Sequence, residues 1–171
     1  MAVRTPYSVR PGEPEDVEFL WDMIYEAAEW HPEGSVSKPP RQEMLSDPSI
    51  SHYVEGWGRA GDAAVVAIDS TDGRRIGAAW YRLMSPQDPS YGFVDASTPE
   101  VAIAVVPDRR GIGVGGALLR ALLDTARLQG FSALSLSVER DNPAAELYER
   151  NGFVKLFHVE GSWTMKVDLS E

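Results

Sequence analysis

Apolar residues recur along this chain with two spacings, one typical of helices and one typical of strands. Helical spacing is clearest in residues 113–130, and it is also seen in residues 14–30, which open with a proline and two acids. Shorter helices are expected near residues 41–45, near 49–57 and at 142–151. Apolar runs bounded by turn residues predict strands at residues 7–10, 63–68, 75–84, 101–106, 133–138, 153–158 and 163–169.

The order of these elements predicts a single domain over residues 1–171, of the α/β class with a mixed (α+β) sheet. Strands 63–68 and 75–84 flank a cluster of turn residues and are expected to form a hairpin. Strands 101–106 and 133–138 are separated by the long helix, which predicts a single parallel crossover. Residues 85–98 are expected to form a long loop.

Composition narrows the classes of function. The chain has 171 residues, 43% of them hydrophobic and 25% charged, as in ordinary globular domains. Its net charge of −10 disfavours a nucleic-acid partner, and the absence of cysteine excludes disulfides and thiolate chemistry. No stretch is apolar enough for a membrane span or a secretory leader, so we expect no membrane partner and a cytoplasmic location. The three histidines lack metal-ligand spacing, so no metal is expected.

A glycine-rich loop between a strong strand and a strong helix is the densest chemical signal. Residues 109–116 read Arg-Arg-Gly-Ile-Gly-Val-Gly-Gly. Glycines let the backbone approach an anion, and a helix start offers free N–H groups, so the loop suits a phosphate-bearing ligand. The alternative is a turn that only lets the helix pack on the sheet. The loop also satisfies G-x-G-x-x-G, but its late position and the single crossover count against a dinucleotide fold. No Lys-Ser/Thr follows, which excludes a P-loop.

A second motif lies after the next strand, where residues 142–153 read N-P-A-A-E-L-Y-E-R-N-G-F. Together with Arg110-x-x-Gly113-x-Gly115 it resembles the GNAT family of acetyl-CoA-dependent N-acetyltransferases, over about a third of the chain. The resemblance implies a central mixed sheet of about six to seven strands flanked by about four helices. It also implies acetyl-CoA as cosubstrate, with the pyrophosphate on the loop and the pantetheine arm beside residues 103–106. The cofactor-binding residues that it implies are Val105, Val106, Arg110, Gly111, Ile112, Gly113, Val114, Gly115, Gly116 and Asn142. Asn142 also suits a helix cap before Pro143.

The resemblance assigns catalytic roles to two residues. Tyr148 stands where the family often places the acid that protonates the leaving thiolate; the alternative is a core tyrosine. Glu100 heads the apolar strand, where the family frequently keeps a base; the alternative is a solvated acid at a strand end. Asp95 and Glu33 are other candidates for the base. A backbone N–H near Val105 would stabilise the oxyanion.

Two classes of function follow. One is an N-acetyltransferase that moves an acetyl group to a primary amine by direct attack, through a tetrahedral intermediate. The other is a non-catalytic acyl-CoA-binding or regulatory module on the same fold. A small-molecule amine and a protein amine are both open as acceptor, the acidic charge favours a cationic one, and a homodimer is compatible with the resemblance.

Overall fold

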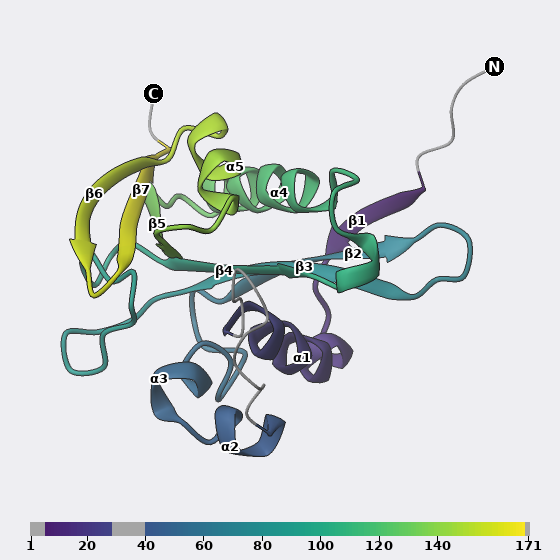
Figure 1. Cartoon of the computed structure of the whole chain (residues 1–171), viewed down its shortest axis with the longest axis horizontal. Helices are drawn as coiled ribbons and strands as arrows, with labels where there is room; N and C mark the ends of the chain where they lie inside the picture. Colours follow the sequence, from purple (N-terminus) through teal and green to yellow (C-terminus); the bar gives the residue numbers. More distant parts are fainter. Residues whose placement is uncertain (1–5, 29–39, 170–171) are drawn as a thin grey trace.

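The computed structural model describes residues 6–28 and 40–169. Its seven strands form one sheet with the order β1-β2-β3-β4-β5-β7-β6, as Figure 1 shows. The sheet is mixed, since β4 and β5 pair in parallel and every other neighbouring pair is antiparallel. The strands are β1 (Tyr7–Pro11), β2 (Ala63–Asp69), β3 (Arg75–Arg82), β4 (Glu100–Val105), β5 (Ala133–Glu139), β6 (Val154–Val159) and β7 (Ser162–Asp168).

Helices cover both faces of the sheet (Figure 1). Helices α4 (Val114–Leu128) and α5 (Ala144–Arg150) lie on one face, and α1 (Val17–Ala28), α2 (Arg41–Leu45) and α3 (Pro48–Ser51) lie on the other. Each layer has its own apolar core, because residues that alternate along β4 point to opposite faces. The predicted mixed sheet and single crossover are confirmed. Five α-helices rather than about four are described, and α3 is shorter than the predicted 49–57.

The parallel pairing of β4 with β5 is short, and it leaves a gap between the two strands. β4 and β5 are paired only at Glu100 and Ser135, and beyond that point the two strands diverge. The edge of β4 that faces β5 therefore has no strand partner along most of its length.

The loop of residues 85–98 packs at the point of divergence. A Cβ atom on Gly92 would lie 2.5 Å from the carbonyl carbon of Leu136, so only glycine lets the loop approach the β5 backbone this closely. The Gly92 N–H donates to the Glu100 carboxylate at 3.0 Å. The loop thereby closes over the start of β4 and buries its first residue.

A buried ion pair fixes the segment that follows α3. Arg82, on β3, binds Asp62 at 2.6 Å, and both side chains are almost fully buried. The same guanidinium donates to the carbonyls of His52 and Glu55, at 3.1 and 2.7 Å. Trp80 donates from its indole nitrogen to the carbonyl of Tyr53 at 3.0 Å. The three bonds to carbonyls hold residues 52–55 against the sheet.

Candidate active site

A cavity of about 870 Å³ occupies the gap between β4 and β5. It is lined from both sides of the sheet: Tyr53 and Ile24 belong to the α1 side, and Leu147 and Tyr148 come from α5 on the other. The diverging strands thus leave a passage through the sheet, at which a ligand on one face can meet a ligand on the other.

The glycine loop forms one end of this cavity. Gly111 and Gly113 have φ values of +81° and +93°, conformations that favour glycine, and Gly113 precedes the first residue of α4. The cavity is lined by eight of the predicted cofactor-binding residues: Val105, Arg110, Gly111, Gly113, Val114, Gly115, Gly116 and Asn142. Val106 and Ile112 lie outside the lining. The Val106 N–H donates to the carbonyl of Ile76, and the Ile112 side chain is half exposed.

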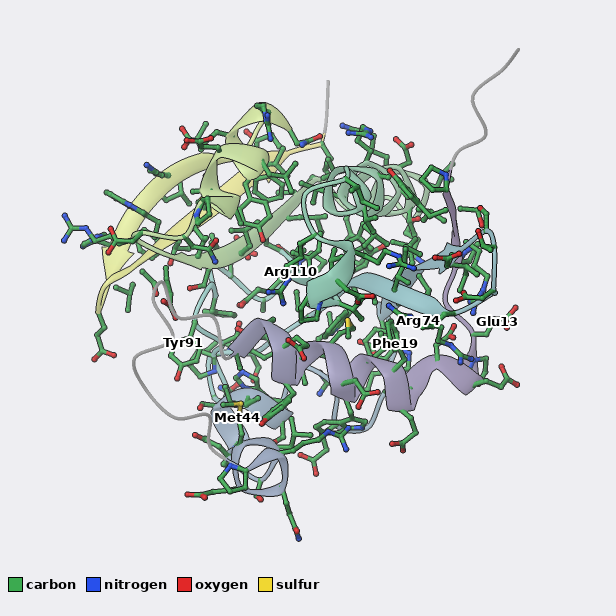
Figure 2. The ribbon with its side chains drawn as sticks, turned by 45° about the vertical axis from the view of Figure 1, so that its right-hand side comes forward. Glu13, Phe19, Met44, Arg74, Tyr91 and Arg110 are labelled. Atoms are coloured by element: carbon green, nitrogen blue, oxygen red, sulfur yellow. The ribbon has the colours of Figure 1, made fainter. Side chains whose placement is uncertain are left out.

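The two arginines of the loop have different surroundings. Arg109 is bound by Asp69 at 2.9 Å and by Asp108 at 3.1 Å, so its guanidinium is already held by carboxylates. Arg110 donates from Nε to the carbonyl of Val105 at 3.0 Å and lies 3.4 Å from Glu26 of α1. Figure 2 shows Arg110 above α1, between the two helical layers. Arg110 is therefore the arginine whose side chain lies across the open edge of β4.

Asn142 caps the turn that starts α5. Its Oδ1 accepts the backbone N–H of Ala144 at 2.9 Å, as expected from its position before Pro143. Asn142 is half-buried and also lines the cavity, so the capping role leaves its amide nitrogen to face a ligand.

Glu100 is not a solvated acid at a strand end, and that alternative is wrong. The residue is only 2% exposed, and its carboxylate accepts hydrogen bonds from the hydroxyls of Tyr53 and Ser90 and from the N–H of Gly92. Burial raises the pKa of Glu100 to about 8, although the bonds from Tyr53 and Gly92 act in the opposite direction. A carboxyl with a pKa near neutrality is suited to gain and lose a proton.

Tyr53 is a site residue that sequence reasoning missed. It is buried, it lines the cavity, and its phenol donates to Glu100, 47 residues away in sequence. Burial and the neighbouring Glu100 raise the pKa of Tyr53 well above its ordinary value, so the phenol stays protonated. No local sequence pattern identifies Tyr53, because its position depends on hydrogen bonds from the distant Arg82 and Trp80 to the backbone of residues 52–55.

Tyr148 lies on the opposite wall of the cavity from Tyr53. It is 7% exposed, and its ring lies 5.9 Å from that of Phe153. Burial raises the pKa of Tyr148, which keeps the phenol protonated at neutral pH. Tyr148 is therefore both a core residue and a wall of the cavity, and the two interpretations of it are compatible.

The other candidates for the base lie elsewhere. Asp95 is exposed and accepts hydrogen bonds from the backbone N–H and the hydroxyl of Ser97, away from the cavity lining. Glu33 lies outside the described residues. Tyr91, labelled in Figure 2, lines the cavity with half of its side chain exposed.

The described ranges, 6–28 and 40–169, contain neither a metal-binding cluster nor a membrane-spanning helix. Within them no group of three or more His, Cys, Asp or Glu side chains is arranged to hold a metal ion. No helix in that part of the chain has the length and apolar character that crossing a membrane requires.

Comparisons with known proteins show which family the chain belongs to. The model of the acetyltransferase (GNAT) family matches residues 21–153. Mycothiol acetyltransferase of Acidimicrobium ferrooxidans is 31% identical over 147 residues, which cover 85% of this chain and 42% of that protein. L-2,4-diaminobutyric acid acetyltransferase of Nocardia farcinica is 27% identical over 148 residues, which cover 82% of this chain and 72% of that protein.

The fold is also that of a solved acetyltransferase. The PaiA N-acetyltransferase of Thermoplasma acidophilum, in complex with coenzyme A, superposes with a TM-score of 0.66 at 17% identity, over 96% of this chain and 99% of that one. The chain spans less than half the length of the mycothiol acetyltransferase that it matches. The match of the family model over most of the chain is decisive: this chain belongs to the GNAT acetyltransferase family.

Proposed function

We propose that this chain is an N-acetyltransferase that moves an acetyl group from acetyl-CoA to a primary amine by direct attack, through a tetrahedral intermediate. The observation that carries the proposal is the cavity between β4 and β5, because it brings a buried carboxyl, Glu100, and a protonated phenol, Tyr148, to one passage through the sheet. Relatives named as acetyltransferases support the same chemistry.

The residues around the cavity fit acetyl-CoA. The open edge of β4 between Glu100 and Val105 offers backbone groups to an extended chain such as the pantetheine arm. Gly111 and Gly113 present backbone without side chains at the start of α4, where the helix dipole favours phosphate. The Arg110 side chain contributes a cation at the same end of the cavity. Acetyl-CoA supplies an acetyl group activated as a thioester.

Proton transfer is assigned to the two walls of the passage. The attacking nitrogen forms a bond to the acetyl carbon and loses a proton, which Glu100 takes directly or through water. The carbon–sulfur bond breaks, and Tyr148 donates its proton to the leaving sulfur. A backbone N–H near Val105 would stabilise the oxyanion between these events.

Burying a carboxyl for this purpose costs stability. The pKa of Glu100 rises from 4.5 to about 8, so its ionisation in the folded protein costs about 5 kcal/mol relative to the unfolded chain. The sign follows from the raised pKa: the contribution of Glu100 to stability is fully present below pH 4.5 and is lost as the pH rises through about 8. A side chain that serves only the fold gives no reason for this cost, whereas a base does.

The acceptor is proposed as an amine on a small molecule or on a protein. The relatives are named for mycothiol and for L-2,4-diaminobutyric acid, so their names do not select one acceptor. The net charge of −10 favours an amine over a nucleic acid as partner.

The test is amine-dependent release of the CoA thiol from acetyl-CoA over a panel of amines, with mass spectrometry of the acetylated product. Tyr148→Phe keeps the ring and should lower kcat by about 10²–10⁴ with little change in acetyl-CoA affinity. Calorimetric binding of acetyl-CoA with no thiol release from any amine would instead indicate the non-catalytic module.

A further inference from the structure

Three carboxylates are found among the described residues that line the cavity between β4 and β5: Glu26, Glu100 and Glu139. Glu26 lies 3.4 Å from Arg110, and Glu100 is buried beneath its hydrogen-bond donors. Glu139, the last residue of β5, is exposed, and no described residue forms a hydrogen bond or an ion pair with its side chain. Its carboxylate is therefore open to a cationic ligand in the cavity.

Glu139 is on the face of the sheet from which Glu100 receives its hydrogen bonds. Residues directly opposite in antiparallel strands point to the same side, and Ser137 of β5 is opposite Thr164 of β7. The Thr164 hydroxyl lies 3.5 Å from the carbonyl of Tyr91, which belongs to the loop that closes over Glu100. Since side chains two residues apart share a face, Glu139 follows Ser137 on the side of that loop.

The same loop links the two carboxylates along β5. The N–H of Gly92 donates to Glu100 at 3.0 Å, and a Cβ atom on Gly92 would lie 2.7 Å from the backbone nitrogen of Ser137. Glu139 is two residues further along the strand. Between Ser135, which pairs with Glu100, and Glu139 the strand rises about 13 Å. An extended molecule with one end at Glu100 can therefore follow β5 to Glu139 inside one cavity.

Hydroxyl groups accompany Glu139 on this wall. Ser162 of β7 is directly opposite Glu139, and Ser137 precedes it on the same face; both serines are half-buried and line the cavity. An ammonium group has three donors and no acceptor, whereas carboxylate and hydroxyl oxygens accept. The end of the wall at Glu139 thus offers acceptors that match an ammonium group.

The cations of the cavity lining belong to other walls. Among the described lining residues, Arg109 and Arg110 come from the glycine loop and Arg150 comes from α5, on the opposite face of the sheet from α1 (Figure 1). A second carboxylate on the acceptor would meet the like charge of Glu139, whereas a second ammonium would be attracted to it. The wall therefore discriminates by charge.

We propose that Glu139 is a specificity-determining residue, and that this wall takes an acceptor carrying a second ammonium group, as in an α,ω-diamine. One nitrogen reaches Glu100 and is acetylated, and the second binds the Glu139 carboxylate beside the hydroxyl of Ser162. This inference rests on the proposed N-acetyltransferase function and names the class of its acceptor.

The experiment compares 1,5-diaminopentane with pentylamine, which has the same carbon chain and lacks the second ammonium. Acetylation by the whole chain is followed by thiol release, and binding of diaminopentane in the presence of CoA is measured by calorimetry. The wild type should prefer the diamine by about tenfold in kcat/KM. Glu139→Gln should raise KM for the diamine about tenfold, with kcat and the kinetics of pentylamine unchanged.

Two controls separate a contact at Glu139 from the general attraction of an acidic protein. Glu146→Gln removes the same charge from an exposed residue of α5 that does not line the cavity, and it should leave the preference unchanged. Raising the ionic strength from about 0.01 to 1 M should weaken the preference of the wild type for the diamine. In Glu139→Gln the ratio of the two amines should stay near one at both ionic strengths.

The outcomes distinguish this inference from the proposed function. Equal kcat/KM for the two amines in the wild type would overturn the role of Glu139, as would a preference that Glu139→Gln leaves intact or that Glu146→Gln removes equally; acetyl transfer itself would still stand. Diaminopentane binding that Glu139→Gln weakens, with no thiol release from either amine, would keep the binding role and overturn the enzyme. Neither binding nor turnover of diaminopentane would overturn the role of Glu139.

Discussion

Removing one hydroxyl, by Tyr53→Phe, should move the pH dependence of acetyl transfer toward alkaline pH. The phenol of Tyr53 donates to the Glu100 carboxylate and so favours its charged form. A hydrogen bond to a charged group contributes about 1.5–3 kcal/mol, and 1.36 kcal/mol corresponds to one pKa unit. The pKa of Glu100, about 8 in the wild type, should therefore rise by about one to two units in the variant.

The direction of the effect on activity follows from the proposed role of Glu100 as the base. A base acts when deprotonated, so kcat/KM rises with pH through its pKa, and a higher pKa shifts that rise to higher pH. At pH 7, on the rising limb, Tyr53→Phe should lose about 10–100-fold in kcat/KM. The loss should shrink as the pH approaches 10.

The assay is kcat/KM for one amine from pH 6 to pH 10, with thiol release as the readout. Ionisation of the amine affects every variant equally and cancels in the comparison. Tyr91→Phe is the matched control, because it removes a phenol hydroxyl from the same cavity without touching Glu100. If kcat/KM of Tyr53→Phe rises at the same pH as that of the wild type, or at a lower pH, the reasoning is refuted.

Three further predictions concern stability and cofactor binding. Glu100→Gln should remove most of the fall in unfolding free energy between pH 4.5 and 8, measured by denaturant titration at both ends; an unchanged pH dependence would mean that Glu100 is not the cause. Gly113→Glu should abolish acetyl-CoA binding in calorimetry. Gly130 has a similar φ of +85° at the far end of α4, so Gly130→Glu should introduce comparable backbone strain but leave acetyl-CoA binding normal. Equal losses of binding in the two variants would mean that the loop is not part of the site. Asp62→Ala should destabilise the fold by about 3–5 kcal/mol because it leaves buried Arg82 unpaired, while Asp108→Ala, from an exposed pair, should cost less than about 1 kcal/mol; similar losses would contradict this.

The features that could be predicted from sequence are those whose cause is local. The periods of apolar residues identify all seven strands and both long helices to within a few residues. The positive φ values of Gly111 and Gly113, and the capping contact of Asn142, depend on residue type and immediate neighbours. These positions also line the end of the cavity formed by the glycine loop.

The Glu100 side of the cavity depends on contacts between distant segments, which no spacing reveals. Glu100 heads a strand and would be solvated by itself; it is buried because Gly92 brings a loop over it and Tyr53 approaches from beyond α3. The irregular chain around residues 49–57 gives no period from which to place Tyr53. One sequence feature could have suggested that Glu100 is buried. Gly92 lies in the loop between two strands, eight residues before Glu100, and a glycine there allows the loop to approach the sheet closely.

Motif positions also differ in what they contact. Val106 lies within the resembled segment, yet its N–H is used by β3, and Ile112 points to solvent. A motif identifies a loop as a whole, while the direction of each residue along it depends on backbone geometry. The cavity therefore contains eight of the ten predicted cofactor residues.

The central claim is that Glu100 takes the proton of the attacking amine. The direct measurement is the pH–rate profile of Glu100→Gln against wild type with a saturating amine whose pKa is near 10, since glutamine keeps the size of the side chain and one acceptor oxygen but cannot act as a base. We expect a loss of about a hundredfold at pH 7 that shrinks toward pH 10, where the amine arrives deprotonated. A loss of equal size at every pH, or no loss at all, would contradict the assignment of Glu100 as the base.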